Sequence, residues 1–428
     1  MACIVCYGSG KLLDSVCPLC DGLNLSLVEG RVDELSDVMG AWKIDDKYNF
    51  RLVTADVSKE AAPGDDGPGS TNERYKELMN EIEKTLKSRP DYTQLNWESN
   101  ATRIASDEEL LLDGVHTEAF IHAMGRRTEE AQIRERAIVR YEVSAGWSKD
   151  TEVAARTSMA ALIDCAKDVF SGKYKHGFVL ARPPSHHAVG NEQLARNGSP
   201  ANLPFGFCHV NSIASAVVNL RKDHPGLRTC IFDFDVHPGN GNEDTFYNDP
   251  SVLTISIHQC GIWPGRDVCR EDYVGGSRAL GSVFNLPVLS GAGDTDYYYA
   301  MNRYIFPEIE AFKPDIIFLA AGYDALNGDP YADQQLTVNW YGWCIAELMR
   351  MDIPLVLNLE GGYSPKHVAE AVDKSINALA GTPAEAFLNH MTIMAERERY
   401  TAHCREMYET RARALNRLKP EPPESEIG

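Results

Sequence analysis

Short apolar runs separated by helical stretches dominate the chain from about residue 175 onward. Strand-length hydrophobic runs occur near residues 177–181, 229–234, 252–257, 316–320 and 354–359. Because these runs are apolar on both faces, they indicate strands that are covered by helices on each side. The pattern therefore predicts an α/β fold of three layers, a sandwich with a central, mostly parallel sheet between helices.

Helical periodicity marks further segments of the chain. Leu78, Ile82 and Leu86 recur at the spacing i, i+4, i+8, which predicts an amphipathic helix. The stretch 141–172 is rich in alanine and has helical spacing. Residues 391–418 form a charged segment with a helical pattern, which we expect to pack at the domain edge or against a partner.

Polar residues with metal-binding chemistry follow the strand predicted at 229–234. The segment from Asp233 reads Asp-Phe-Asp-Val-His-Pro-Gly-Asn-Gly. Side chains at i and i+2 of an extended segment point to the same side, so Asp235 and His237 should face one point. A carboxylate with an imidazole suits a divalent metal that keeps open positions for water. Taken alone, the segment also fits a strand end with a helix-capping Asp and a surface His.

Residues of similar chemistry follow other predicted strands. His186 and His187 follow a double proline after the first run, and paired imidazoles suit proton transfer near neutral pH. Asp324 ends a Gly-Tyr-Asp segment, and Tyr363 follows two glycines after the last run. Separately, these residues also fit loop histidines, a helix cap and a packed ring. The C-terminal ends of strands in open α/β sheets are, however, where ligands bind.

Together these segments resemble the zinc-dependent histone deacetylase family, in its class II branch, within the arginase/deacetylase fold. The resemblance runs from about residue 51 to about residue 380, and it includes the motifs at 203–211, 249–258 and 328–330. It implies zinc-dependent hydrolysis of N6-acetyl-lysine in proteins, histones or others, with release of acetate.

The resemblance also implies roles for individual residues. It assigns the catalytic zinc to Asp235, His237 and Asp324. Of the tandem histidines, His187 is implied as the general base and then the general acid, whereas His186 would tune the electrostatics.

Further roles follow from the same resemblance. Asp233 is implied as the partner of His186, and Asn240 as an uncharged partner that should leave His187 less basic. Tyr363 is implied as the hydrogen-bond donor to the oxyanion, worth on the order of 10² to 10³ in rate. A potassium site is implied at the backbone carbonyls of Asp233, Asp235 and His237 and the Ser256 hydroxyl.

The substrate tunnel shows both matches and departures. The residues that match its walls and lip are Gly206, Phe207, Trp263 and Tyr331. Ser185 stands where the family usually has glycine, which would cost stability if that position required a positive φ. Trp263 is followed by Pro-Gly-Arg-Asp267 rather than the usual Pro-Gly-Thr-Gly, and Tyr331 stands where an aliphatic residue is frequent. These departures bear on the choice of substrate rather than on the chemistry.

A second cysteine-rich motif occupies the N-terminus. Cys3, Cys6, Cys17 and Cys20 form two CxxC pairs, a pattern typical of a structural zinc site with four thiolates. A disordered, reduced segment and two disulfides are the alternatives. This predicted finger holds Lys11 as its one basic side chain, so it lacks the charge that nucleic-acid binding requires. A finger that docks a protein partner or promotes dimerisation is therefore the better expectation.

Composition narrows the setting of the protein. The chain has 428 residues and a net charge of −20, which disfavours direct binding of nucleic acid and favours basic partners. The sequence has no run of about 18 apolar residues, the length that a membrane-spanning helix requires. Its first residues do not resemble a secretion signal. We expect a protein of the nucleus, the cytoplasm or both that is not secreted.

These observations divide the chain into a four-cysteine finger at 1–25, a deacetylase-like catalytic domain at 26–400, and a helix end with a disordered tail at 401–428. One alternative function is an acetylpolyamine amidohydrolase, for which Asp267 would be an acidic residue at the lip. A much weaker alternative is an inactive scaffold that docks acetylated partners.

Overall fold

The computed structural model describes most of the chain between residues 49 and 418. The described residues are 11–12, 15–16, 49–54, 71–98, 101–133, 139–142, 145–197, 200–393 and 397–418. The cysteines of the predicted finger and the predicted C-terminal tail lie outside these ranges. A short antiparallel pair, β1 (Lys11–Leu12) with β2 (Ser15–Val16), lies between the two CxxC pairs along the chain.

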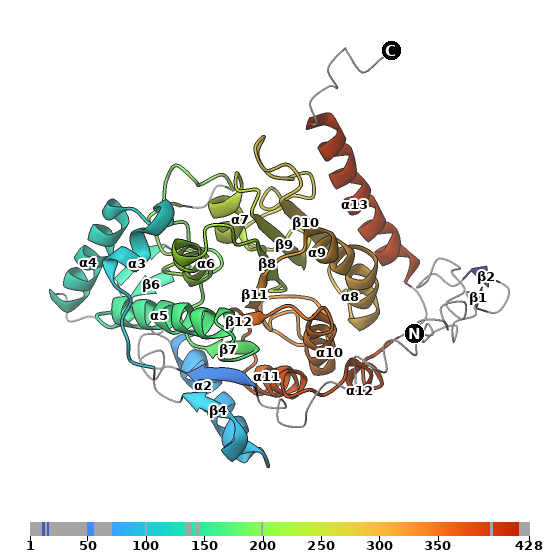
Figure 1. Ribbon diagram of the computed structural model, residues 1–428, viewed down its shortest axis with the longest axis horizontal. Coiled ribbons are helices and arrows are strands. Elements are labelled where there is room, and N and C mark those ends of the chain that lie inside the picture. Colours follow the sequence, from blue (N-terminus) through green and yellow to red (C-terminus); the bar gives the residue numbers. More distant parts are fainter. Residues whose placement is uncertain are drawn as a thin grey trace.

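A sheet of eight parallel strands forms the centre of the molecule (Figure 1). In spatial order its strands are β10 (Val283–Val288), β9 (Val252–Gln259), β8 (Thr229–Asp233), β11 (Ile316–Ala321), β12 (Leu355–Leu359), β7 (His176–Leu180), β3 (Phe50–Thr54) and β4 (Asn96–Glu98). Every neighbouring pair is parallel. The five apolar runs of the sequence are all strands of this sheet, which confirms the predicted α/β architecture.

Helices cover both faces of the sheet (Figure 1). One hydrophobic cluster joins the sheet to α5 (Thr151–Phe170) and α6 (Ser212–Asp223), and the other joins it to α2 (Thr71–Ser88), α10 (Val338–Met349) and α11 (Pro365–Leu379). The remaining helices are α3 (Asp107–Leu111), α4 (Glu118–Ile133), α7 (Asn240–Phe246), α8 (Asp294–Ala300), α9 (Phe306–Phe312), α12 (Ala384–Leu388) and α13 (Glu398–Leu418), with short helical turns η4 (Tyr92–Gln94), η5 (Leu112–Gly114) and η6 (Met301–Ile305).

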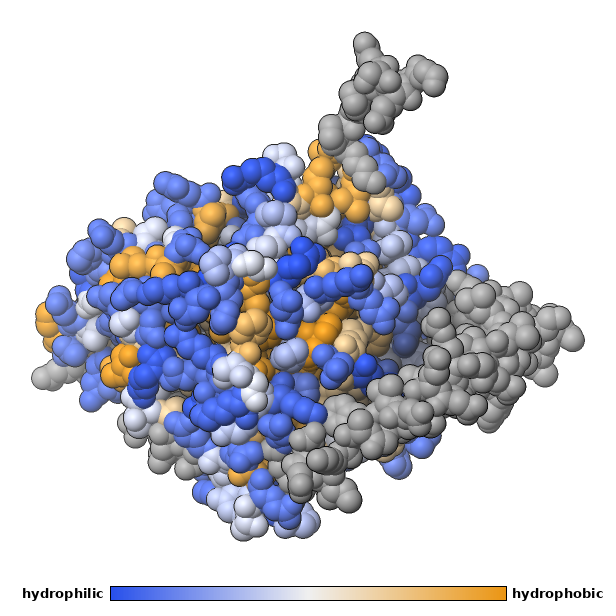
Figure 2. All heavy atoms as spheres, in the orientation of Figure 1, coloured by the Kyte–Doolittle hydropathy of each residue, from blue (hydrophilic) through white to orange (hydrophobic). Residues whose placement is uncertain are grey.

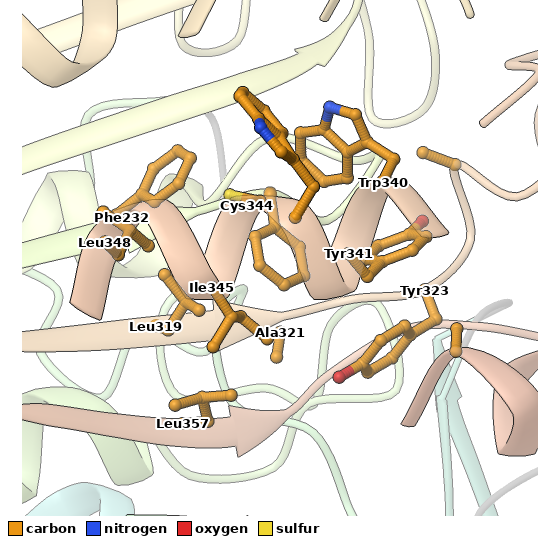
Figure 3. Packing of buried hydrophobic residues seen from close by; sticks show 14 of the residues in the cluster. Phe232, Leu319, Ala321, Tyr323, Trp340, Tyr341, Cys344, Ile345, Leu348 and Leu357 are labelled. Carbon is orange, nitrogen blue, oxygen red and sulfur yellow. The ribbon is translucent and has the colours of Figure 1, made fainter. Parts of the chain in front are cut away.

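Alternation along each strand divides the core between these two layers. In β11, Leu319 and Ala321 belong to the cluster under α10, whereas Phe318 and Ala320 belong to the cluster under α5. Figure 3 shows Tyr341 and Ile345 of α10 packing toward the side chains of β11 and β12. Burial on both sides explains why these strands are hydrophobic throughout.

Three strands of this central sheet had no clear signal in the sequence. β10 contains Asn285 and Pro287, which interrupt an otherwise apolar run. Proline cannot donate to a sheet ladder, but β10 pairs only with β9 and therefore tolerates it at the edge. At the opposite side of the sheet, β3 includes the charged Arg51 and β4 has only three residues.

The helix predictions were correct in kind but not in every boundary. Leu78, Ile82 and Leu86 are fully or almost fully buried on α2, as their spacing predicts. The alanine-rich helix α5 begins only at Thr151, because the preceding residues form the antiparallel strands β5 (Val139–Glu142) and β6 (Ala145–Trp147). The predicted charged helix forms as α13, packs against the edge strand β10 and extends away from the body (Figure 1).

Hydrophilic residues predominate on the face seen in Figure 2, and hydrophobic ones form scattered patches. Within the described residues, none of the helices combines the length and the apolar character needed to cross a membrane.

Candidate active site

The candidate catalytic residues follow four neighbouring strands of the sheet, β8, β11, β12 and β7. Asp233 is the last residue of β8, and Asp324 follows the end of β11. Successive strands run from β8 outward to β9 and β10, and the chain then returns to β11 on the other side of β8. The site therefore lies where the strand order reverses, which is the usual ligand position in open α/β sheets.

Three potential metal ligands converge at this point. One donor atom from each of Asp235, His237 and Asp324 lies within 4.8 Å of the others, and all three residues are buried. The His237 Nδ1 atom is 3.1 Å from Asp235 Oδ1 and 3.0 Å from Asp324 Oδ2. We call these three residues, together with Asp233, His186, His187 and Asn240, the strand-end site.

Backbone N–H groups orient the two carboxylates. Val236 N–H donates to Asp324 Oδ1 at 2.8 Å, and Gly361 N–H donates to Asp235 Oδ2 at 2.7 Å. A Cβ atom at Gly361 would lie 2.2 Å from Asp324 Oδ2, so the chain approaches the carboxylates more closely than any other residue would allow. These contacts fix the orientation of both carboxylate groups.

The electrostatics of this group favour a cation. Burial lowers the pKa of His237, but hydrogen bonds to Asp235 and Asp324 and their negative charge outweigh burial and raise the pKa to about 10. The same negative field would attract a divalent ion. Two carboxylates with one imidazole form a donor set that suits zinc and leaves further coordination positions open, so the residues present fit a catalytic zinc.

The tandem histidines differ in their partners. His186 Nδ1–H donates to Asp233 Oδ2 at 2.9 Å, whereas His187 Nδ1 lies 2.6 Å from Asn240 Oδ1. Because an amide oxygen only accepts, His187 carries its proton on Nδ1 and keeps the Nε2 lone pair for another proton. The structure thus pairs each histidine with the partner that the resemblance implied.

These partners give the two histidines opposite pKa shifts. Burial lowers the pKa of His187 well below 6.5, and the charges of His186 and His237 lower it further. Burial also acts against a charged His186, but the carboxylates of Asp233 and Asp235 outweigh it and raise the pKa to about 10. His187 is therefore neutral near pH 7, as a general base must be, beside a cationic His186.

Ser185 does not incur the backbone cost considered from the sequence. The φ angle of Ser185 is not positive, so this position does not require glycine. Its hydroxyl instead donates to Glu360 Oε1 at 2.6 Å, and its N–H donates to Glu360 Oε2 at 2.6 Å. The His186 N–H also donates to Glu360, at 3.2 Å. This buried carboxylate, which follows β12, thereby anchors the histidine loop.

A tight turn positions the wall of the predicted tunnel. Phe205 and Cys208 exchange backbone hydrogen bonds at 3.0 and 2.9 Å, and both residues between them have positive φ, 54° at Gly206 and 63° at Phe207. A Cβ atom at Gly206 would lie 2.2 Å from the His187 ring, so glycine is required there. The left-handed conformation of Phe207 is costly for a bulky residue and is typical of functional sites.

Aromatic rings cluster beside the strand-end site. The Trp263 ring lies 4.9 Å from the His187 ring and 4.6 Å from the Phe205 ring. The Tyr363 ring is 5.9 Å from Phe207 and meets Tyr331 edge to face at 4.6 Å. Trp263 and Tyr331, which we call the tunnel lip, are 37% and 44% exposed, whereas Tyr363 is 8% exposed.

Sequence reasoning missed supporting residues of this site. Phe205 contacts Trp263, Glu360 holds the histidine loop, and Asp329 accepts N–H bonds from Tyr331 and Tyr363. Glu360 and Asp329 each stand near a strand end in a motif that was recognised, so their position was a usable signal. Their hydrogen bonds depend on loops that meet only in the fold.

The other predicted sites have less structural support. Ser256 pairs with Asp233 across β9 and β8, and its hydroxyl lies 2.8 Å from His258 Nδ1. The Asp267 side chain is 92% exposed and lies 3.7 Å from Arg270.

Comparison with known proteins identifies the family. The sequence model of the histone deacetylase domain family matches residues 70–379 of this chain. The chain therefore belongs to this zinc-dependent family. Histone deacetylase HDA1 of Candida albicans is 32% identical over 305 residues, 69% of this chain and 34% of that protein. Histone deacetylase 14, chloroplastic, of Arabidopsis thaliana is 33% identical over 279 residues, 62% of each chain. Histone deacetylase 10, chloroplastic, of Oryza sativa subsp. japonica is 37% identical over 215 residues, 49% of this chain and 46% of that protein.

A solved structure shares the fold. The crystal structure of the HDA15 HD domain superposes with a TM-score of 0.69 at 24% identity, covering 88% of this chain and all of that one. The matched region spans 34% of the Candida albicans protein and 46% of the Oryza sativa protein, so the chain matches only part of the length of these relatives.

Proposed function

We propose that this protein hydrolyses N6-acetyl-lysine in proteins, histones or others, and releases acetate. One observation carries the proposal: Asp235, His237 and Asp324 converge within 4.8 Å at the strand ends, and the His187 ring lies 6.2 Å from the His237 ring. Bound zinc would be held by these three residues, polarise the amide carbonyl and lower the pKa of the attacking water.

His187 moves the protons of the reaction. Its Nε2 takes a proton from the attacking water and later gives it to the departing lysine amine. The amide oxygen of Asn240 holds the ring in the required tautomer. His186, paired with Asp233, supplies positive charge close to the developing oxyanion.

Tyr363 and the aromatic rings act on the substrate. The Tyr363 hydroxyl donates a hydrogen bond to the oxyanion of the tetrahedral intermediate. Phe205, Phe207 and Trp263 would enclose the methylenes of the lysine side chain, each worth about 0.8 kcal/mol when buried. Tyr331, which is 44% exposed, would be among the first residues that a protein substrate contacts.

Acetate release tests this proposal. The purified zinc-loaded chain is incubated with a panel of acetyl-lysine peptides and, separately, with acetylspermidine. We expect acetate from the peptides. Turnover of acetylspermidine alone would instead identify an acetylpolyamine amidohydrolase, and turnover of neither by zinc-loaded protein would favour an unusual acyl group or a docking scaffold.

The residues near the tunnel lip support an acetylpolyamine substrate less well than a protein substrate. An acidic gatekeeper must face the substrate cation with its charge available. Asp267 lies instead near the guanidinium of Arg270, and its side chain is largely in solvent. We therefore rank protein acetyl-lysine above acetylpolyamines.

We also propose a structural zinc at Cys3, Cys6, Cys17 and Cys20. The antiparallel pair β1–β2 between the two CxxC pairs agrees with a small finger. Metal analysis should then find two zinc equivalents per chain, and one after the double change Cys3→Ser and Cys6→Ser. One equivalent in both proteins would contradict the finger. We expect its role to be contact with a protein partner.

The potassium site remains a proposal for the carbonyls of Asp233, Asp235 and His237 with Ser256. The strand pairing of Asp233 with Ser256 supports their proximity. Activity that increases with potassium, but not with choline, would support it. Ser256→Ala should reduce that dependence.

The domain limits 1–25, 26–400 and 401–428 and the cellular location are likewise proposals. The cysteines of the described part are free, and all but Cys260 are buried, which is typical of a reducing compartment. We propose the nucleus, the cytoplasm or both, without direct nucleic-acid or membrane binding. Microscopy of a tagged full chain tests the location.

A further inference from the structure

The loop after β11 carries a second buried carboxylate beyond Asp324. Asp329 is 6% exposed. Its Oδ1 accepts the N–H of Tyr331 at 2.9 Å, and its Oδ2 accepts the N–H of Tyr363 at 2.8 Å. One side chain therefore ties the backbone of the tunnel lip to the backbone of the proposed oxyanion donor.

The segment that carries Tyr363 depends on such anchors. Two glycines precede it, and Gly362 has a φ of 123°, so the local backbone has little stiffness of its own. Two carboxylates hold this segment: Asp235 accepts the N–H of Gly361, and Asp329 accepts the N–H of Tyr363. The first anchor belongs to the strand-end site, and the second belongs to the lip loop.

We propose that Asp329 is a positioning residue that holds the Tyr363 hydroxyl at the oxyanion and couples this position to Tyr331 at the lip. Asp329 uses a different carboxyl oxygen for each of the two N–H groups, so one side chain can hold both segments. Donors to an oxyanion are effective only when they are placed beforehand, and small displacements cost much of the rate. The inference rests on the proposed deacetylase function.

Hydrogen exchange tests the clamp without reference to activity. Asp329→Ala removes both acceptors, and Asp333→Ala is the matched control, because Asp333 lies in the same loop and accepts from Gln259 and Ser290 instead. Peptides containing Tyr331 and Tyr363 should both exchange up to about tenfold faster in Asp329→Ala, the factor expected for losing one hydrogen bond. They should stay unchanged in Asp333→Ala. Unchanged exchange at Tyr363 in Asp329→Ala would overturn the clamp.

Kinetics test whether the clamp acts through the Tyr363 hydroxyl. Asp329→Ala should lower kcat by about 10- to 100-fold, less than loss of the hydroxyl itself, with little change in KM. In a Tyr363→Phe background the same change should cost at most about twofold, because the hydroxyl that it positions is gone. An equal loss of kcat in both backgrounds would show a merely structural effect and overturn the proposal.

A milder variant covers the case in which Asp329→Ala does not fold. In Asp329→Asn the side-chain oxygen can accept one N–H, and the amide group must face the other. If the N–H of Tyr363 loses its acceptor and exchanges faster, kcat should fall; if only the N–H of Tyr331 exchanges faster, kcat should stay nearly unchanged. A fall in kcat with faster exchange at Tyr331 alone would contradict the positioning role of Asp329. If the unmodified chain releases no acetate while the exchange pattern holds, the proposed function fails and the clamp stands.

Discussion

The strand-end site and the tunnel lip lie side by side but are built differently. Trp263 of the lip approaches the His187 ring at 4.9 Å, yet it is 37% exposed, whereas His187 is 3% exposed. Strand-end residues are fixed by buried hydrogen bonds from two or more elements. Lip residues project from loops and contact neighbours mainly through their rings. We therefore expect the strand-end site to govern the chemistry and the loops of the lip to govern the choice of substrate.

Removing a metal ligand should have the largest effect on the strand-end site. In Asp324→Ala the remaining Asp235 and His237 leave too few ligands, so we expect loss of the catalytic zinc and of acetate release. Metal analysis by mass spectrometry and an activity assay check this. Asp267→Asn, a carboxylate change near the lip, should retain its zinc. Equal zinc content in both variants would contradict the assigned ligands.

Tyr363→Phe should have the second-largest effect on acetate release. It removes one donor to the oxyanion and should lower kcat by about 10² to 10³. Zinc content and KM should change little, because neither the ligands nor the tunnel walls are altered. Steady-state kinetics with an acetyl-lysine peptide provide the measurement. A change confined to KM would assign Tyr363 to the lip rather than to the chemistry.

Asn240→Asp tests the role of His187 as general base through the pH dependence of activity. A carboxylate beside His187 favours its imidazolium form and raises its pKa. Since the base must be neutral, the acidic limb of the kcat/KM profile should move to higher pH. Activity should therefore fall most near pH 6 and least near pH 9. A profile identical to that of the unmodified chain would contradict the role of His187 as base.

Trp263→Ala should affect binding rather than chemistry. Losing one wall of the tunnel should raise KM by about tenfold, which corresponds to about 1.4 kcal/mol, with kcat nearly unchanged. The ratio of activities on different acyl-lysine peptides should also change. A large fall in kcat without a rise in KM would show that Trp263 supports His187 directly.

The smallest effect is expected for Ser185→Gly. The change removes the hydroxyl that donates to Glu360 and adds backbone freedom. It should lower the free energy of unfolding by about 1 to 2 kcal/mol, seen as a lower Tm in a thermal melt. Activity should change little, because the Ser185 and His186 N–H groups still bind Glu360. An unchanged Tm would mean that the hydroxyl contributes nothing.

Sequence patterns predicted the strands at whose ends the residues of the strand-end site stand, because these apolar runs suit strands that are buried on both faces. Asp235 and Asp324 come together because parallel strands end at one edge. Asp329 and Phe205 were missed, since their roles depend on loops that meet only in three dimensions. The edge strand β10 was missed because Pro287 is tolerated only where no further strand pairs.

The most direct test measures acetate release from one acetyl-lysine peptide by three zinc-loaded proteins: the unmodified chain, Tyr363→Phe and Trp263→Ala. If the strand-end site governs the chemistry and the tunnel lip governs substrate binding, the unmodified chain releases acetate. Tyr363→Phe should then lower kcat at constant KM, and Trp263→Ala should raise KM at nearly constant kcat. Absence of acetate from the unmodified, zinc-loaded chain, or the same kinetic change in both variants, would contradict this division of roles.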